Sequence, residues 1–276
     1  MPHRTPIANW DDAYSNARFI EGADDFPLRW TSEARKFRQA RVAEGNARLD
    51  IPYGNKPRQK MDVFYPGAKP DGLFVFVHGG YWCALDKFRW SHAASGALEK
   101  GWAAALPSYT LCPEVTIDVI TREIACAVEN AAAQVSGPIV IVGHSAGGHL
   151  ISRLLCRDST LTQVAKDRIV TAVSISGVHD LRPLLKTSIN KTLRLTEATA
   201  MTESPALQLP DTQAKLICWV GAEERPEFLR QNALLANIWS GFGVETLCVE
   251  SSGEHHFNVV DGLSKSDSAL MSCIFS

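Results

Sequence analysis

Ser145 lies at the centre of a Gly-x-Ser-x-Gly pattern whose outer positions are Gly143 and Gly147. A β-branched apolar run, residues 139–142, precedes the pattern, and an apolar, helix-permissive segment follows it. A serine on a sharp turn from strand to helix exposes its hydroxyl, and glycines flank it because this turn tolerates no bulk. The unpaired N–H groups of the helix can stabilise negative charge beside that serine. The pattern predicts a nucleophilic serine; the alternative is a glycine-rich turn that contains a serine by chance.

A serine hydroxyl is a weak nucleophile at neutral pH and needs a base within hydrogen-bond reach. In chains with this turn, the acid and then the histidine follow the serine in sequence. The loop after the last predicted strand contains His255 and His256. One of the two is expected to be the base. We favour His256, because Phe257 is expected to begin an apolar helix that can anchor it, and His255 is the alternative.

The acid that orients the base should follow the preceding strand, residues 215–220. Glu224 comes at the far end of the next loop, just before a proline that can begin a helix, and is the favoured acid. Glu223 is its close competitor. Asp180 is a third candidate, because some hydrolases take the acid from the position after the earlier strand.

A second loop could stabilise the oxyanion of a tetrahedral intermediate. Gly79 and Gly80 follow the apolar run Leu73–Val77 after His78, and consecutive glycines let backbone amides approach a substrate closely. The expected oxyanion hole consists of this loop, including Tyr81, and the N–H of Ala146. Tyr81 and Trp82 are suited to line a pocket for an aryl group.

Three other histidines lie close to these motifs in the sequence. His78 precedes the glycine turn, so we expect it to brace the loop and not to act as the base. His144 and His149 flank Ser145 in positions that orient them away from its hydroxyl. We therefore predict that both have packing roles.

Apolar strands alternate with helical segments from Gly72 onward, which predicts an α/β fold with a mostly parallel sheet covered on both faces. The expected strands are residues 73–77, 102–107, 139–142, 169–176, 215–220 and 244–250, and the main helices are 116–135, 226–239 and 257–274. In such sheets ligands bind at the carboxyl ends of the strands, which is where the candidate residues cluster.

The remaining segments are expected to frame this sheet. Residues 48–52 and 61–65 look like an antiparallel hairpin at one edge. Residues 1–47 and 179–213 are expected to be cap or lid elements, together forming a small helical cap. No repeat or linker is evident, so a single domain, residues 1–276, is predicted.

The composition excludes several classes of function. The net charge is −2 over 276 residues, which gives no case for nucleic acid or an anionic membrane as partner. We find no signal peptide, membrane-length apolar run, zinc-ligand spacing or phosphate loop, and expect no metal and no cofactor. The seven cysteines form no Cys-x-x-Cys pair and are expected to be buried, with Cys126, Cys218 and Cys248 inside apolar segments. A reducing, cytoplasmic location is therefore expected, and a homodimer is compatible with the sequence.

Two motifs, His-Gly-Gly-Tyr-Trp from His78 and Gly-His-Ser-Ala-Gly-Gly-His-Leu from Gly143, resemble those of the α/β-hydrolases. More narrowly, the chain resembles the kynurenine formamidase (arylformamidase) group, close to the hormone-sensitive-lipase-like esterases, over nearly its whole length. The resemblance implies the α/β-hydrolase fold with Ser145 as nucleophile, Glu224 as acid and His256 as base.

Two departures from the related esterases matter. Tyr81-Trp82 stands where many of them carry a third glycine, which favours the formamidase group, and a glutamate stands where aspartate is commoner. By resemblance, the expected function is a serine hydrolase that converts N-formylkynurenine to kynurenine and formate, with a small-molecule acyl substrate as its partner. The alternatives are a carboxylesterase for short-chain esters and a hydrolase-fold binding protein without catalysis.

Overall fold

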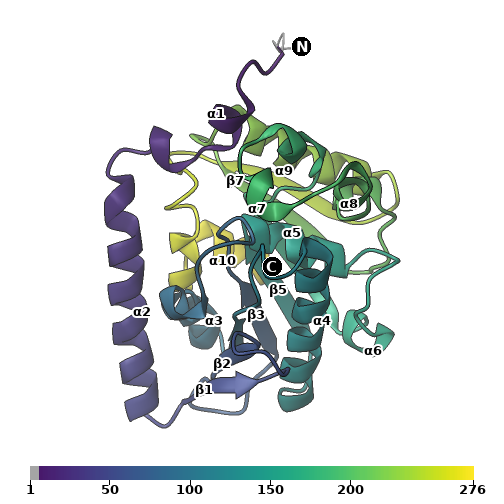
Figure 1. Cartoon of the computed structure of the whole chain (residues 1–276). Helices are drawn as coiled ribbons and strands as arrows, with labels where there is room; N and C mark the ends of the chain where they lie inside the picture. The colour runs from purple at the N-terminus through teal and green to yellow at the C-terminus, as the bar shows by residue number, and fades with distance from the viewer. Residues whose placement is uncertain (1–5) are drawn as a thin grey trace.

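The computed structural model describes residues 6–276, and its centre is a sheet of eight strands in the order β1-β2-β4-β3-β5-β6-β7-β8 (Figure 1). The β1–β2 and β2–β4 pairs are antiparallel and all other pairs are parallel. The strands are β1 Ala47–Pro52, β2 Lys60–Phe64, β3 Leu73–Val77, β4 Ala103–Pro107, β5 Ile139–His144, β6 Ile169–Ile175, β7 Lys215–Gly221 and β8 Thr246–Ser251. The predicted α/β class, the mostly parallel sheet and the edge hairpin are confirmed.

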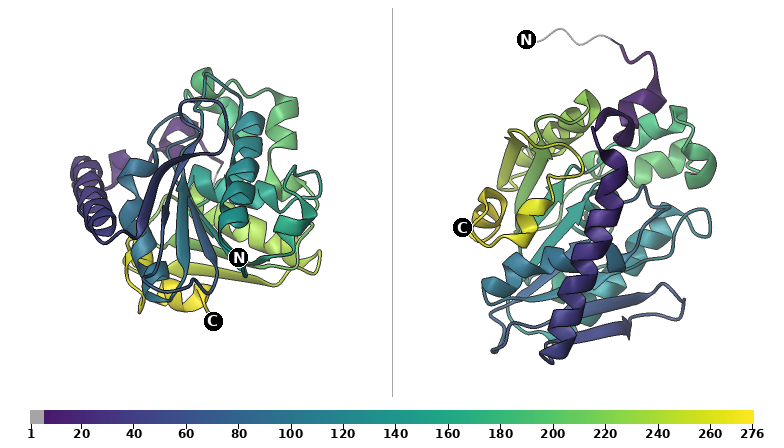
Figure 2. Two further views of the ribbon diagram at one scale, coloured as in Figure 1. Left: turned by 90° about the horizontal axis from the view of Figure 1, so that it is seen from below. Right: turned by 90° about the vertical axis from the view of Figure 1, so that its left-hand side faces the viewer.

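Helices lie on both sides of this sheet (Figure 2). The α-helices are α1 Trp10–Tyr14, α2 Phe26–Ala43, α3 Ser95–Glu99, α4 Ile117–Gln134, α5 Ala146–Leu154, α6 Gln163–Lys166, α7 Asn190–Leu193, α8 Glu197–Thr202, α9 Pro226–Ser240 and α10 Ala269–Ile274. Short 3₁₀ helices are η1 Ala17–Phe19, η2 Ala23–Asp25, η3 Lys87–Arg89, η4 Ser91–Ala94, η5 Arg182–Lys186, η6 Pro205–Leu207 and η7 Asp261–Ser264. Within residues 6–276, no helix combines the length and apolar character needed to cross a membrane.

The alternation of side chains along each strand builds two hydrophobic layers. In β3, Leu73, Val75 and Val77 pack on the face covered by α4, α5 and α9. Phe74 and Phe76 pack on the opposite face, which α2, α3 and α10 cover. Because both faces are buried, the strand is apolar at every position, and this explains why its pattern is continuous and not alternating.

The prediction of one terminal helix over residues 257–274 is wrong. The chain instead makes turns, the short helix η7 and then α10. Ser268 begins α10: its hydroxyl accepts the Met271 N–H at 3.0 Å and donates to the Gly262 carbonyl at 2.7 Å. A capping serine in the middle of an apolar stretch divides it into separate elements.

The prediction of buried cysteines holds only in part. Cys218 on β7 is buried, but Cys126 on α4 and Cys248 on β8 are exposed. The reason is position: α4 turns one side to solvent, and β8 is an edge strand. All seven cysteines lie within residues 6–276, and all are free thiols there.

Of the two segments expected to form a cap, α1 of the first lies close to the second, whereas α2 packs against η3 and η4. Residues 1–5 of the first segment fall outside the described residues, and α1 lies beside η5 and α9 (Figure 1). The second segment, residues 179–213, contains η5, α7, α8 and η6. The Ser188 N–H donates to Asp11 at 2.6 Å, so the two segments are hydrogen-bonded to each other.

Candidate active site

Ser145 occupies the turn between β5 and α5, in the strand–turn–helix context that its motif requires. Its backbone has φ 53° and ψ −117°, and its N–H donates to the Ile175 carbonyl of β6 at 2.8 Å. A Cβ at Gly147 would overlap the backbone carbonyl of Val77, and one at Gly143 would overlap the Gly147 carbonyl. Both flanking positions therefore require glycine, because neighbouring backbone fills the space that a side chain would need.

Glu224 and His256 form a buried pair beside this turn. Glu224 Oε2 lies 2.6 Å from His256 Nδ1, and both side chains are almost fully buried. Its other oxygen, Oε1, accepts the Gly221 N–H at 3.0 Å and the Ser176 hydroxyl. A carboxylate on Nδ1 holds the ring in one orientation and leaves Nε2, on the ring's other side, for proton transfer.

The His256 ring is anchored differently from the expectation based on Phe257. Phe257 does not begin a helix. The ring packs most closely against Phe228 of α9, with centroids 4.6 Å apart, and against His144, with centroids 4.7 Å apart, while the Phe257 ring lies at 6.1 Å. His144 Nε2 also lies 3.0 Å from the His256 carbonyl, so His144, directly before the serine, hydrogen-bonds to the loop of the histidine.

The three alternative residues are held elsewhere. His255 Nδ1 accepts the Phe257 N–H at 3.2 Å, and the His255 ring packs edge-on against Phe26 of α2. Glu223 is exposed. Asp180 forms an ion pair with Arg182 at 2.9 Å. Within residues 6–276, none of the three hydrogen-bonds to Ser145 or His256.

The glycine loop lies against the serine. A Cβ on Gly79 would come within 3.0 Å of Ser145 Cβ, and Gly80 has φ 111°, which disfavours any side chain. Tyr81 also has a positive φ, 48°. In the described part of the chain, no acceptor is bonded to the N–H groups of Gly80, Tyr81 or Ala146. Donors left unpaired beside the serine are what an oxyanion hole requires.

Tyr81 and Trp82, which we expected to line a substrate pocket, differ in position. The Tyr81 hydroxyl donates to the Tyr14 carbonyl at the end of α1, and its side chain is partly exposed. Trp82 is fully buried, and its indole N–H donates to His149 Nδ1 at 3.2 Å. Trp82 therefore packs into the core, because its N–H finds its acceptor on α5.

The histidines near the motifs have structural contacts, as predicted. His78 Nδ1 lies 2.7 Å from the Gly79 carbonyl, and the ring stacks on Tyr109 at 4.4 Å, so it braces the glycine loop. Burial lowers the pKa of His78 to about 4 and that of His149 to about 3. Burial also holds the pKa of His144 well below its ordinary value. All three rings are therefore neutral near pH 7, which fits their roles as hydrogen-bonded packing groups.

Sequence reasoning missed Ser176 and Tyr14. Ser176 is fully buried at the end of β6 and hydrogen-bonds to Glu224. The Tyr14 hydroxyl donates to Glu227 at 2.7 Å and accepts from Gln231 at 2.9 Å, which joins α1 to α9. The only sequence signal for Ser176 is its position as the last residue of the predicted strand 169–176, and for Tyr14 there is none.

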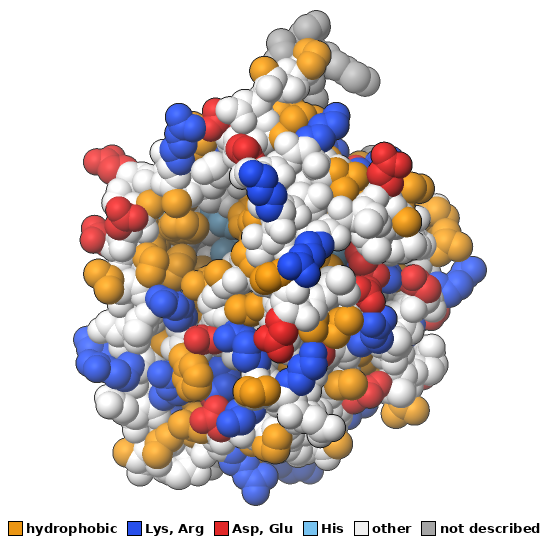
Figure 3. Space-filling model, viewed as in Figure 1, with side chains coloured by type: hydrophobic (Ala, Val, Ile, Leu, Met, Phe, Trp, Pro, Cys, Tyr) orange, Lys and Arg blue, Asp and Glu red, His pale blue; other side chains and the backbone are white. Residues whose placement is uncertain are grey.

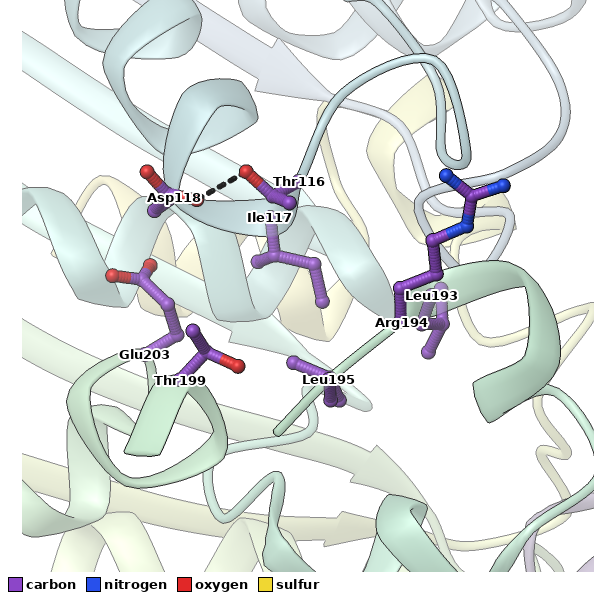
Figure 4. Close-up of a pocket in the computed structure, with 8 residues that line it drawn as sticks. All are labelled: Thr116, Ile117, Asp118, Leu193, Arg194, Leu195, Thr199 and Glu203. Carbon is purple, nitrogen blue, oxygen red and sulfur yellow. Dashed lines mark hydrogen bonds between the residues drawn. The ribbon is translucent and has the colours of Figure 1, made fainter. Parts of the chain in front are cut away.

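Two surface features lie near these groups. One face of the molecule is hollowed beside the upper end of α2, with histidine atoms in the hollow and hydrophobic side chains around it (Figure 3). A separate small pocket lies between the start of α4 and the α7–α8 segment (Figure 4). Its lining includes Thr116, Arg194 and Glu203 but none of the candidate catalytic residues. Glu203 is connected to the site only indirectly, through its carbonyl, which lies 2.6 Å from His149 Nε2.

Comparison with known proteins finds the same fold and, within that fold, similarity to kynurenine formamidases. Residues 74–257 match the model of a family described as having the alpha/beta hydrolase fold. The kynurenine formamidase of Danio rerio is 29% identical over 78% of this chain and 76% of its own length. That of Drosophila melanogaster is 27% identical over 76% of this chain and 75% of its own length.

Solved structures extend the comparison. A crystal structure from Silicibacter sp., provisionally assigned as a thioesterase, is 47% identical, with a TM-score of 0.92 over 96% of this chain and 98% of that chain. Esterase B from Lactobacillus rhamnosis shares the fold at 15% identity, with a TM-score of 0.66 over 91% of this chain and 92% of that chain. With its serine turn, its eight-stranded sheet and a family match over residues 74–257, the chain belongs to the α/β-hydrolase family.

Proposed function

We propose that this chain is a serine hydrolase that removes a formyl group from an aryl formamide such as N-formylkynurenine. The observation that carries the proposal is the buried hydrogen bond between Glu224 Oε2 and His256 Nδ1, 2.6 Å long, beside the Ser145 turn. The similarity to kynurenine formamidases of a fish and an insect supports the substrate class.

In the proposed mechanism, Ser145 Oγ attacks the formyl carbonyl carbon while His256 Nε2 takes the hydroxyl proton. The carbonyl oxygen becomes an oxyanion and accepts hydrogen bonds from the N–H groups of Gly80, Tyr81 and Ala146. His256 returns the proton to the aryl nitrogen as the C–N bond breaks. A water molecule, deprotonated by His256, then attacks the formyl ester of Ser145. His256 gives this proton to Ser145 Oγ as the ester bond breaks, and formate leaves. Glu224 stabilises the imidazolium in both steps.

A second candidate is hydrolysis of short-chain esters or thioesters. The 47% identical protein from Silicibacter sp. is provisionally assigned as a thioesterase, which favours this candidate. The same serine, base and oxyanion donors would serve it, since only the leaving atom differs. A third reading, a binding protein without catalysis, is disfavoured because the Glu224–His256 hydrogen bond and unpaired loop amides are all retained.

Substrate comparison separates these candidates. Purified protein and Ser145→Ala would be assayed on N-formylkynurenine, on p-nitrophenyl acetate and butyrate, and on a short-chain acyl thioester. The proposal expects the highest kcat/KM on the formamide and loss of activity in Ser145→Ala by about 10³-fold or more. If the protein hydrolyses the esters or the thioester but not the formamide, the proposed substrate is wrong and the second candidate is favoured. Activity that survives Ser145→Ala would reject the serine mechanism.

The acid and base are tested by neighbouring matched pairs. His256→Ala and Glu224→Gln should each lower kcat by about 10³-fold or more, whereas His255→Ala and Glu223→Gln should have mild effects. Each control removes the same chemical group one residue away. Equal mild losses within either pair would mean that a different loop supplies the acid or the base.

A further inference from the structure

Ser176 lies at the point where the candidate acid meets the sheet. It is the first residue after β6, it is fully buried, and its backbone has a positive φ of 53°. Its N–H donates to the Trp219 carbonyl of β7 at 2.7 Å, and its hydroxyl donates to Glu224 Oε1. We propose that Ser176 is a positioning residue that fixes the Glu224 carboxylate so that only Oε2 faces His256. This inference rests on the triad of the proposed function.

The hydrogen bonds of the carboxylate show why one hydroxyl matters. Oε1 accepts two donors, the Gly221 N–H at 3.0 Å and the Ser176 O–H, while Oε2 faces His256 Nδ1 at 2.6 Å. A glutamate side chain has free torsions, and a single donor on Oε1 does not prevent rotation of the carboxylate. Two donors from different elements do prevent it. Because the Glu224 side chain is 0% exposed, solvent is poorly placed to replace a donor that is removed.

The backbone at Ser176 also connects the acid to the nucleophile. The carbonyl of the preceding residue, Ile175, accepts the Ser145 N–H at 2.8 Å, and the Ser176 N–H is bonded to β7, the strand that leads to Glu224. The end of β6 thus contacts the serine turn on one side and the acid strand on the other. A displacement of Ser176 would be transmitted to both.

The residue type is informative as well. A φ of 53° is disfavoured for serine and favourable for glycine, so backbone geometry alone would select glycine here. A serine in this conformation brings a hydroxyl to a position where the carboxylate uses it. The hydroxyl is therefore the feature to remove in a test.

Ser176→Gly is the decisive variant because it deletes the hydroxyl and relieves the backbone. We expect its thermal stability to stay near that of the wild type, because relief of the positive φ offsets the lost hydrogen bond, while kcat falls about 10- to 100-fold with little change in KM. Labelling of Ser145 by a fluorophosphonate probe should slow by a similar factor. Ser176→Ala should lose the same activity but be less stable than Ser176→Gly, because it keeps the positive φ.

Ser174→Ala is the matched control. Ser174 is also a fully buried serine of β6, but its hydroxyl is paired with His179 Nε2 at 3.1 Å and not with Glu224. Its kcat and labelling rate should stay within about twofold of wild type, since no hydrogen bond to the carboxylate is removed. Equal losses in Ser174→Ala and Ser176→Gly would overturn the positioning role, because any buried hydroxyl of β6 would then have the same effect.

An NMR measurement, which does not depend on activity, tests this inference separately from the proposed function. The proton of the Glu224–His256 hydrogen bond should give a far-downfield NMR resonance, which Ser176→Gly is expected to shift or broaden and Ser174→Ala to leave in place. A stable Ser176→Gly with unchanged resonance, kcat and labelling rate would overturn the inference. If wild-type Ser145 resists the probe and no acyl substrate turns over, the proposed function fails. The resonance then still decides whether Ser176 positions the carboxylate.

Discussion

Mild acid should unfold this protein through its buried histidines. Burial is the main reason that the pKa of each lies far below the ordinary value of 6.5. The pKa falls to about 4 for His78 and His92 and to about 3 for His149 and His179. In the unfolded chain the same residues are hydrated and titrate near 6.5.

The sign and the magnitude follow from proton binding. Below pH 6.5 the unfolded state binds a proton at each of these histidines and the folded state does not, so the free energy of unfolding decreases as the pH falls. Each histidine contributes at most about 1.4 kcal/mol per pH unit down to its folded pKa, or about 2 kcal/mol between pH 7 and pH 5. Four such residues amount to about 8 kcal/mol, which is comparable with the whole stability of an ordinary domain. His144 acts in the same direction.

Urea unfolding followed by circular dichroism, at pH steps between about 7 and 5, measures this slope, and titration of the unfolding reaction counts the protons taken up. His179→Gln should lower the slope by about 1.4 kcal/mol per pH unit, because one titrating group is lost. His255→Gln is the comparison variant: burial also lowers the pKa of His255, but that ring is partly exposed, so the slope should change less than in His179→Gln. A free energy of unfolding that stays constant between about pH 7 and pH 5, with no proton uptake, would refute the reasoning and mean that these rings are hydrated in the folded state.

Three further predictions concern single contacts. Tyr81→Phe removes the hydroxyl that hydrogen-bonds to the Tyr14 carbonyl and holds the glycine loop to α1, and it should lower kcat about tenfold in steady-state assays. An unchanged kcat would mean that α1 does not hold the glycine loop. Gly147→Ala would overlap a backbone carbonyl of β3 and should cost about 3 kcal/mol or more in urea unfolding, and a stable, active variant would contradict the geometry of the serine turn. Lys87→Met should lower the free energy of unfolding by about 3–5 kcal/mol in the same assay, because it leaves the buried carboxylate of Asp62 without its cation. A loss near zero would mean that solvent reaches this ion pair.

The strands were predictable because the run of apolar residues within each strand already indicates that the strand is buried. Leu73–Val77 is apolar at every position, and that pattern fits a strand covered on both faces. The serine turn was also predictable from its pattern: Gly143 is required by the backbone of Gly147 within the motif, although Gly147 is required by the Val77 carbonyl of β3, which the motif does not contain. Glu224 and His256 were chosen by their places after successive strands. The structure brings these two side chains into contact, and their roles in catalysis stay predictions.

Contacts between distant segments could not be predicted in this way. Trp82 packs into the core because its N–H meets His149, 67 residues along the chain. Tyr14 reaches Glu227 across 213 residues. An aromatic residue can serve a pocket or a core equally well, and only the tertiary structure selects between them. Cys248 is exposed for a similar reason: its strand looks apolar, but its place at the edge of the sheet depends on the order of all the other strands.

Backbone strain marks the edge of the sheet where the candidate site lies. Ser145, Ser176, Tyr81 and Trp82 all have positive φ, and all follow directly or closely after the carboxyl ends of neighbouring strands. None is glycine, so each side chain is retained despite the cost of its conformation. The Ser176 hydroxyl donates to Glu224, the Ser145 N–H donates to the Ile175 carbonyl, and the Tyr81 hydroxyl donates to the Tyr14 carbonyl. Strain of this kind persists only where surrounding contacts hold it, and the hydrogen bonds from the serine turn to β6 and from β6 to β7 supply them. These hydrogen bonds connect β5, β6 and β7 at this edge, and we expect the removal of the Ser176 hydroxyl there to affect activity more than stability.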